Sequence, residues 1–421
     1  MKERLSAFDA FFVAYQETSG VLMQLGVEVE LRGQLTRSDL EGILRHVVRR
    51  WPPLGQRLRR GWFGLRWDGE GEIGEMLCVA EGREALNEWR NRPLDPFKEP
   101  PFQLLWIDEG SLNLLAFRAH HAVVDGEGFF AVCVEAVRSL VRAANFAEER
   151  ESFKRAKVRE ALGNLRSLRK EAKTNRSARV AMRSCVPGET SIVEMDLEQD
   201  HIQQLKRRAS ELNVAPGWLC ASAWMRAIHA WNVFQRGDST SLISLEVPVS
   251  LRRRRDKSVQ IGNLISPLTL YGDATQPLDE LALCLKQQMT KAMRRRLQLA
   301  LPSLSAPGRF LPWPIFRKLA ANPELTGVAT SHFSWFEQSG TIHDEISRLS
   351  NGALQLVDQK IYTPVCLHMG AAMSVLAWPE RVQIFLTHRL SALSTRDANE
   401  LLELVVEELG QKQRALRQVA V

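Results

Sequence analysis

Two adjacent histidines, followed by three residues and an Asp-Gly pair, are the part of this chain whose residue types and spacing point most clearly to chemistry. They are His120 and His121, with Asp125 and Gly126. The apolar residues 112–119 before them predict a buried strand, along which side chains alternate between two faces. We therefore expect one imidazole to face a site and the other to lie in the structure behind it.

The alternation assigns each histidine to one face of the predicted strand. His121 shares its face with Leu115, Phe117 and Ala119. His120 shares the other face with Leu114, Ala116 and Arg118. After the Asp-Gly pair, apolar residues recur at helical spacing, which predicts a turn and then a helix. A histidine at the point where a strand leaves its sheet is well placed to act as a general base.

The pattern His-His-x-x-x-Asp-Gly resembles the signature of one acyltransferase superfamily. Its members include the condensation domains of nonribosomal peptide synthetases, chloramphenicol acetyltransferase, plant and fungal acyltransferases, and bacterial wax ester synthases. The resemblance implies an α/β fold (two-layer α+β) of two chloramphenicol acetyltransferase-like subdomains with a tunnel between them. It also implies that His121 is the catalytic base at the middle of the tunnel, supported by His120, Asp125 and Gly126.

The implied chemistry is acyl transfer from a thioester, in which a base removes a proton from the attacking hydroxyl or amine. Neutral imidazole does this near pH 7 and typically contributes about 10²–10⁴-fold to the rate. A lone buried histidine is more often a core residue, but within this motif we favour catalysis by His121. A zinc site is the weaker alternative, because adjacent strand residues face apart and no further ligand has a recognised spacing. We expect no metal and no permanently bound cofactor.

The aspartate of this superfamily pairs with an arginine from the second subdomain. Residues 247–252 resemble the P-V-N-L-R stretch of relatives, with Ser250 in place of Asn, so that Arg252 is the matching arginine. Alternatively, Arg252 is only the first of the four arginines 252–255 on a solvated loop. We expect Gly126 to serve the turn with a positive φ, which only glycine adopts freely.

Two further segments resemble the wax ester synthase branch of the superfamily. Residues 261–266 resemble its Gly-Asn motif, in which Asn263 would line the tunnel or cap a turn. Residues 5–12 resemble its L-S-x-x-D-x-x-F opening. We also considered backbone or side-chain donors near Gly126 and Asn263 as stabilisers of an oxyanion.

Residues 331–336 lie where plant relatives carry Asp-Phe-Gly-Trp-Gly, and only the Phe and Trp survive. This departure argues against close kinship with the plant branch. Ser331 and His332 are candidates for the tunnel lining, with a core or surface position as the alternative for His332.

Charge and length outline the organisation of the chain. Its 421 residues suit two units of about 200 each. The segment from Lys154 to Arg183 carries eleven Lys or Arg and two Glu, so the rest of the chain is slightly acidic although the whole carries +7. We predict an N-terminal subdomain at 1–147, a basic helical linker at 148–186 and a C-terminal subdomain at 187–421.

Local patterns predict similar α/β elements in both halves. In the first half, residues 27–31 predict a strand with one wet face, and Ser38 with Glu41 predicts a capping box for the helix that follows. In the second half, residues 192–197 and 241–249 predict strands. A helix capped by Asp200 and a second one starting at Pro216 are expected between them.

No stretch is apolar enough to span a bilayer, and the first residues contain no signal core, so we expect a cytoplasmic protein without a transmembrane segment. The six scattered cysteines suit free thiols. The pI of about 9.2 raises the question of nucleic-acid binding, but no recognition motif accompanies the charge, so we expect no nucleic acid as a partner.

These observations favour a stand-alone acyltransferase that moves an acyl group from acyl-CoA, or from the phosphopantetheine arm of an acyl carrier protein, to a small-molecule alcohol or amine. The motifs of the wax ester synthase type favour an ester product. The alternative is a catalytically silent, condensation-like protein that recruits a carrier protein through its basic segment, an idea that the intact histidine motif disfavours.

Overall fold

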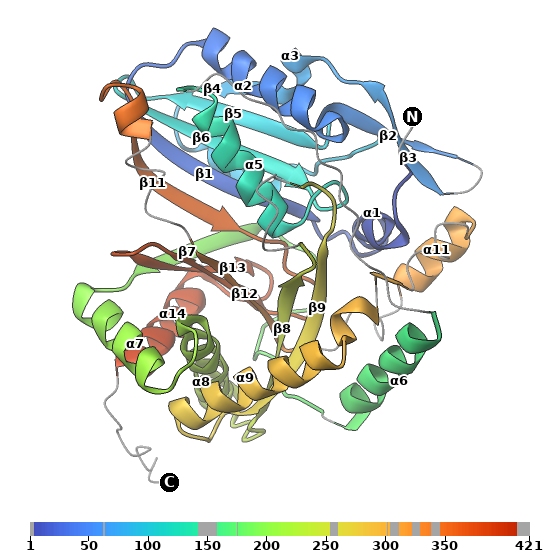
Figure 1. Ribbon diagram of the computed structural model, residues 1–421, viewed down its shortest axis with the longest axis vertical. Helices are drawn as coiled ribbons and strands as arrows, with labels where there is room; N and C mark the ends of the chain where they lie inside the picture. Colours follow the sequence, from blue (N-terminus) through green and yellow to red (C-terminus); the bar gives the residue numbers. More distant parts are fainter. Residues whose placement is uncertain are drawn as a thin grey trace.

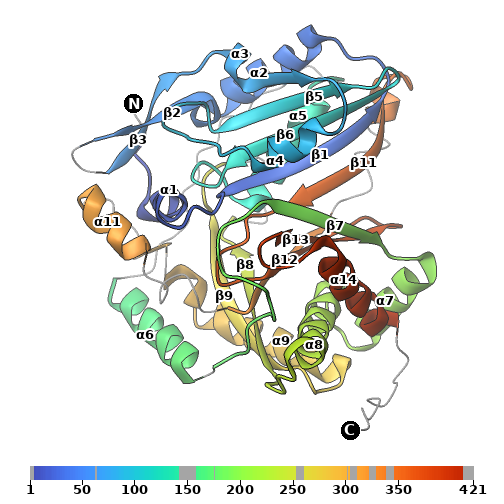
Figure 2. The same ribbon diagram turned by 180° about the vertical axis from the view of Figure 1, so that it is seen from behind.

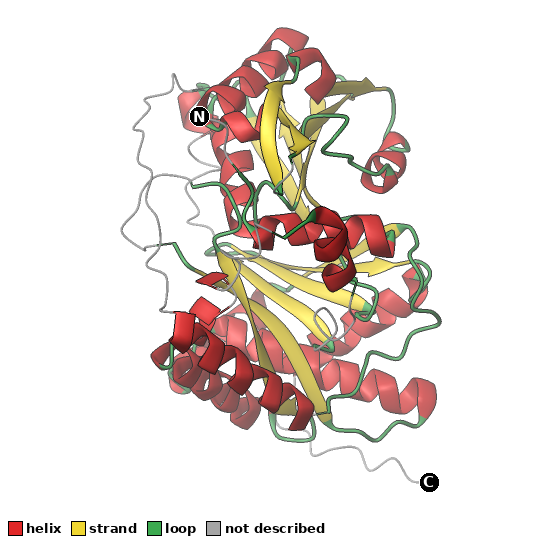
Figure 3. Cartoon of the chain, turned by 90° about the vertical axis from the view of Figure 1, so that its right-hand side faces the viewer, coloured by secondary structure: helices red, strands yellow, loops and turns green. Residues whose placement is uncertain are grey.

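Two mixed β-sheets, one in each lobe, organise the computed structural model of the protein (Figure 1). The structure describes residues 4–61, 64–141, 158–174, 176–252, 260–300, 302–303, 311–321, 329–337 and 346–410. A view from the side separates the two lobes along the long axis of the molecule (Figure 3). The predicted combination of helices and sheets in two lobes is confirmed.

The sheet of the N-terminal lobe has five strands in the order β11-β1-β6-β5-β4. Neighbouring strands are antiparallel, except for β4 and β5, which are parallel. The bounds are Gln24–Arg32 for β1, Leu77–Ala80 for β4, Phe102–Asp108 for β5, Leu112–His120 for β6 and Gln355–Tyr362 for β11. Helices α2 (Arg37–Arg50) and α5 (Gly126–Arg138) cover one face (Figure 1), and α4 (Ala85–Asn91) lies on the other (Figure 2).

Strand β6 divides its side chains between these two layers, as its alternation predicts. Leu115, Phe117 and Ala119 pack in the main core of the lobe. Leu114 and Ala116 pack in a second cluster with Leu86 and Trp89 of α4. Each strand residue therefore contributes to one of two separate apolar layers.

Strand β1 has no wet face at its centre, which corrects the sequence prediction. Glu28 is only 3% exposed, and Arg90 of α4 donates to it from Nε at 2.6 Å. The charge stays buried because α4 covers this face and supplies a cation, which a local pattern of alternation cannot show.

Two predicted helix starts are also corrected. The capping box of α2 is formed by Thr36 and Asp39, while Glu41 lies within the helix and pairs with Arg45 at 2.7 Å. Helix α7 (Gln199–Glu211) has Glu198 at its N-cap without a capping hydrogen bond, and Asp200 lies in its first turn. In both cases the helix begins earlier than the predicted cap.

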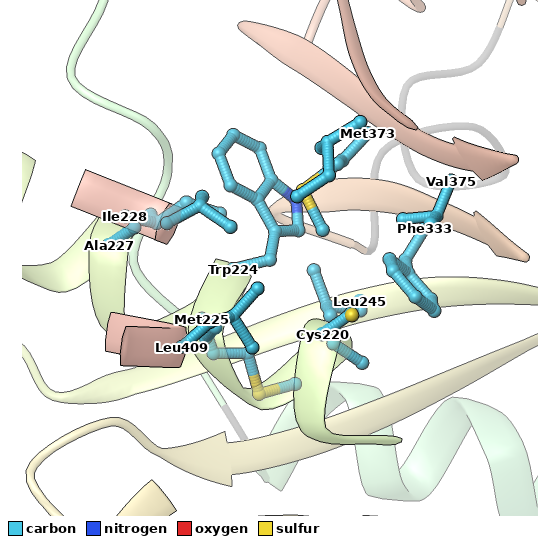
Figure 4. Packing of buried hydrophobic residues seen from close by; sticks show 14 of the residues in the cluster. Cys220, Trp224, Met225, Ala227, Ile228, Leu245, Phe333, Met373, Val375 and Leu409 are labelled. Carbon is cyan, nitrogen blue, oxygen red and sulfur yellow. The ribbon is translucent and has the colours of Figure 1, made fainter. Parts of the chain in front are cut away.

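The C-terminal lobe contains a six-stranded sheet in the order β7-β13-β12-β10-β8-β9. The bounds are Thr190–Asp196 for β7, Leu242–Ser250 for β8, Ile265–Asp273 for β9, Ser331–Glu337 for β10, Ala371–Ala377 for β12 and Val382–Arg389 for β13. Helices α7, α8 (Pro216–Arg236), α9 (Leu278–Arg294) and α14 (Thr395–Gly410) cover the face away from the N-terminal lobe (Figure 1). Trp224 of α8 fills the centre of this layer beside Met373 and Phe333 (Figure 4).

The remaining elements lie around the two sheets. They are α1 (Ala7–Ser19), η1 (Pro52–Gly55), β2 (Gln56–Arg60), β3 (Leu65–Glu70), α3 (Ile73–Met76), α6 (Val158–Thr174), η2 (Leu297–Leu299) and α11 (Trp313–Ala320). Within the predicted basic linker at 148–186, residues 158–174 form α6, residues 176–186 form no helix, and the others lie outside the described residues. No helix of the described residues is long and apolar enough to cross a membrane. All six cysteines are free.

One strand crosses between the lobes. β11 follows β10 in the chain but pairs with β1 of the N-terminal sheet, with Gly26 opposite Tyr362. A C-terminal subdomain at 187–421 therefore places this strand in the wrong lobe, since strand pairing rather than chain order decides where it lies. The Tyr362 ring covers Gly26 so closely that a Cβ there would lie 1.7 Å from a ring carbon.

We predict that Gly26→Ala destabilises the protein by about 1–3 kcal/mol, because the added methyl overlaps the Tyr362 ring and the strand must shift. The matched control is Gly42→Ala in α2, where an added Cβ meets nothing within 4 Å, and which we expect to stabilise the helix by about 0.5–1 kcal/mol. Urea unfolding of both variants measures the two effects. Equal stability of Gly26→Ala and wild type would contradict the close packing of β11 on β1.

Candidate active site

His121 lies directly after the last residue of β6, at the junction of the two lobes. Its backbone N–H donates to the Met23 carbonyl at 2.8 Å, which extends the pairing of β6 with the chain before β1. The side chain is 8% exposed. The ring of Phe12 from α1 stacks on the imidazole at 3.9 Å between centroids, with 6° between the planes. The imidazole is therefore held on rigid elements with little freedom to rotate.

The surroundings of His121 favour a neutral imidazole. Burial lowers its pKa below the usual 6.5, and His332 lowers it further, while its own carbonyl, Asp125 and Asn263 act in the opposite direction. Nδ1 is buried and has no hydrogen-bond partner among the described residues. Such a neutral imidazole can accept a proton at physiological pH.

His120 points into the structure behind the site, as the alternation predicts. It is fully buried, and its Nδ1 accepts a hydrogen bond from the Ala122 N–H at 3.0 Å. Nδ1 is therefore unprotonated, and the ring hydrogen is on Nε2. Burial first, and then His121, lowers the pKa of His120 to about 3. His120 is a neutral part of the structure rather than a second base.

Asp125 connects the histidine motif to the C-terminal lobe. One carboxylate oxygen caps α5 by accepting from the Gly128 N–H at 2.8 Å. The other accepts from Arg252 Nη1 at 3.0 Å and from the Leu264 N–H at 2.7 Å. The Asp125 side chain is fully buried and that of Arg252 is 12% exposed. The structure thus brings the predicted pair together, with Arg252 after β8 rather than on a free loop.

The glycine that makes room for this ion pair is Gly128, not Gly126. Gly126 has no positive φ and begins α5, so the expected role of Gly126 in the turn is wrong. A Cβ on Gly126 would meet nothing closer than the Phe336 ring at 3.6 Å. A Cβ on Gly128 would lie 2.6 Å from Arg252 Nη2, because the guanidinium from the other lobe packs against this turn.

Asn263 joins the histidine segment to the N-terminal helix. Its Nδ2 donates to the His121 carbonyl at 2.7 Å and to Asp9 Oδ1 at 2.8 Å. Asp9 in turn closes the capping box of α1 with Ser6. Because both hydrogens of Nδ2 are used in this way, the Asn263 side-chain amide has no free hydrogen to donate to an oxyanion.

The two tunnel candidates within residues 331–336, Ser331 and His332, lie on opposite faces of strand β10. The Ser331 hydroxyl is buried in the C-terminal core, where Trp224 Nε1 donates to it at 3.0 Å and it donates to the Ala371 carbonyl at 2.6 Å. Ser331 is therefore not part of the site, since its side chain faces the helices. His332 has the opposite orientation, with Nε2 2.7 Å from Ser334 Oγ and Nδ1 3.5 Å from Glu246 Oε1.

Four residues of this region were not predicted as site residues. Asp9 and Phe12 are the D and F of the L-S-x-x-D-x-x-F segment. The sequence therefore contains a motif for them but does not indicate which residues they contact. Glu246 and His368 belong to no motif. Glu246 is connected to the site through His332, and His368 through its electrostatic effect on Glu246. The described residues contain no cluster of three or more metal-ligating side chains.

Comparison with known proteins places the fold. No family model matches the chain, and neither does any curated protein. Among solved structures, trichothecene 15-O-acetyltransferase TRI3 from Fusarium sporotrichioides matches with a TM-score of 0.74 at 11% identity, over 97% of this chain and 95% of that one. The condensation domain of the monacolin K polyketide synthase MokA matches with a TM-score of 0.69 at 13% identity, over 97% and 96%. The starter condensation domain of rhizomide synthetase RzmA matches with a TM-score of 0.69 at 14% identity, over 97% and 93%.

These matches cover nearly the whole length of each partner. The chain therefore has the same two-lobed fold as these condensation domains and this acetyltransferase, which is the fold that its histidine motif leads us to expect.

We predict that Arg252→Ala lowers the free energy of unfolding by about 3 kcal/mol, because Asp125 loses its counterion while remaining buried. Activity should fall with it, since the ion pair holds the segment that contacts His121. The control is Arg207→Ala, whose exposed pair with Glu211 at 4.0 Å should contribute less than about 0.5 kcal/mol. An unchanged melting temperature for Arg252→Ala would count against the ion pair as a structural link.

Proposed function

We propose that the protein is an acyltransferase that moves an acyl group from a thioester to a hydroxyl or amine, with His121 as the general base. The observation that carries the proposal is the buried, ring-stacked imidazole of His121 at the lobe junction, fixed by hydrogen bonds to its backbone from both lobes. Burial also lowers the pKa of this imidazole, which favours the neutral form. A base held in this way removes a proton without first losing one itself.

In the proposed reaction, both substrates meet between the lobes beside His121. Its Nε2 takes the proton as the acceptor oxygen or nitrogen attacks the thioester carbonyl carbon. The tetrahedral intermediate collapses, the carbon–sulfur bond breaks, and the imidazolium returns the proton to the thiolate. No acyl-enzyme is needed, because positioning both substrates together supplies much of the acceleration.

The thioester donor is supported by the comparisons as well as by the motif. The RzmA starter condensation domain was solved in complex with C8-CoA and Leu-SNAC. We extend this to the present chain only as part of the proposal, with acyl-CoA or an acylated carrier protein as donor and a tunnel between the lobes as the meeting place.

The test is thiol release from a panel of acyl-CoAs in the presence of mixed alcohols and amines. His121→Ala should lower the release by about 10²–10⁴-fold while leaving the circular dichroism spectrum intact. His229→Ala, at a histidine of α8 whose Nδ1 lies 3.3 Å from the Thr240 carbonyl, is the matched control and should release thiol as wild type does. Equal release by His121→Ala and wild type would remove His121 as the base. If no acyl-CoA releases thiol, the same variants are compared with acylated carrier proteins as donors.

A further inference from the structure

A row of side chains crosses the C-terminal sheet on the face turned toward the N-terminal lobe. Glu246 of β8, His332 of β10, Ala372 of β12 and Thr387 of β13 are successive cross-strand neighbours in this row. The same face of β10 also presents Phe336, which contacts the core of the N-terminal lobe. The row therefore lies where the two lobes meet.

Glu246 and His332 form a polar pair within this row. His332 Nδ1 is 3.5 Å from Glu246 Oε1, and its Nε2 is paired with Ser334. The Glu246 side chain is 35% exposed, and it contacts His332 through Oε1. The carboxylate therefore keeps an exposed surface that a ligand can reach.

This pair also interacts with the candidate base across the lobe boundary. Burial opposes ionisation of Glu246, but His332, His368 and His121 together hold its pKa below the usual value. The carboxylate is therefore charged at neutral pH. His121 belongs to the N-terminal lobe and Glu246 to the C-terminal lobe, and the Glu246 row lies on the face of its sheet that meets the lobe of the candidate base.

Hydrogen-bonding atoms without partners accompany the pair. Thr387 Oγ1, Ser374 Oγ and His368 Nε2 are buried and have no hydrogen-bond partner among the described residues. Ser374 is the cross-strand neighbour of Ser334, on the same face as the row. A buried polar atom without a partner is uncommon and costs about 1–3 kcal/mol, whereas a polar ligand would satisfy it. An alkyl alcohol would leave these atoms unsatisfied.

We propose that Glu246 and His332 form the acceptor-recognition site and that the acceptor carries a positively charged nitrogen, bound by the Glu246 carboxylate. This inference rests on the proposed acyl transfer and names its acceptor class: amino alcohols or diamines. The nucleophile is the hydroxyl, or a second, uncharged amino group, of the same molecule. His121 takes its proton, the new carbon–oxygen or carbon–nitrogen bond forms, and the thiol leaves with that proton.

The experiment uses amino alcohols and diamines of increasing size, each paired with the neutral analogue in which methyl replaces one ammonium. Thiol release gives kcat and KM for each acceptor, and thermal shift without donor gives binding independently of turnover. Wild type should prefer the charged member by about 10-fold or more, the effect of one ion pair of about 1.4 kcal/mol. Glu246→Gln, which keeps the shape and removes the charge, should lose this preference mainly through KM. Glu198→Gln, at an exposed carboxylate of the same lobe, should retain it.

The two measurements separate this inference from the proposed function. Stabilisation of wild type but not of Glu246→Gln by charged acceptors, without thiol release from either acyl-CoA or acylated carrier protein, would support the recognition site and contradict acyl transfer. Thiol release that favours neither member of a pair, and that Glu246→Gln leaves unchanged, would overturn the recognition site while acyl transfer stands. The absence of any thermal shift and of any charge preference in wild type would also overturn it.

Discussion

The buried carboxylate of Asp125 is the contact on which the rest of the site depends. It caps the helix after the histidines and binds Arg252 and the Leu264 N–H from the other lobe. A buried carboxylate is tolerated only where cations and N–H groups compensate for lost hydration. The two lobes must therefore meet in one arrangement for Asp125 to be satisfied, and that arrangement also places His121.

The same constraint explains the neighbouring residues. Gly128 lacks a side chain because Arg252 packs against it, and Asn263 lies one residue before Leu264, where it reaches the His121 carbonyl and Asp9. Segments of the chain more than 100 residues apart thus share one hydrogen-bond network. Within it, His121 alone of the two histidines combines a small exposed surface with a ring that lies against Phe12.

The sequence was sufficient where short-range periodicity decides the structure. The opposite orientations of His120 and His121 follow from a strand period of two, and the helix after Asp125 follows from apolar spacing. The pairing of Asp125 with Arg252 follows only from the resemblance, because the two residues are 127 positions apart and no local signal predicts their contact. The sequence points to Gly126 as the essential glycine, whereas the structure requires a glycine at Gly128. The reason is that Arg252 of the other lobe packs where a Cβ of Gly128 would lie.

Long-range pairing accounts for the remaining differences. The sequence does not show which face of β10 is turned toward the helices. It therefore cannot assign Ser331 to the core and His332 to the opposite face. Glu246 carries no motif, and its position beside His332 follows from the register between β8 and β10. Strand β11 joins the N-terminal sheet through pairing with β1, which neither chain order nor composition indicates.

The measurement that tests the account most directly is a pH titration of histidine-¹⁵N-labelled protein by NMR, with His121→Ala used to assign the resonance of the candidate base. The central claim is that the lobe junction keeps the imidazole of His121 neutral, so that it can accept a proton. The account predicts that His121 titrates below its usual pKa of 6.5, since burial disfavours the charged ring. A pKa at or above 6.5 would contradict the account.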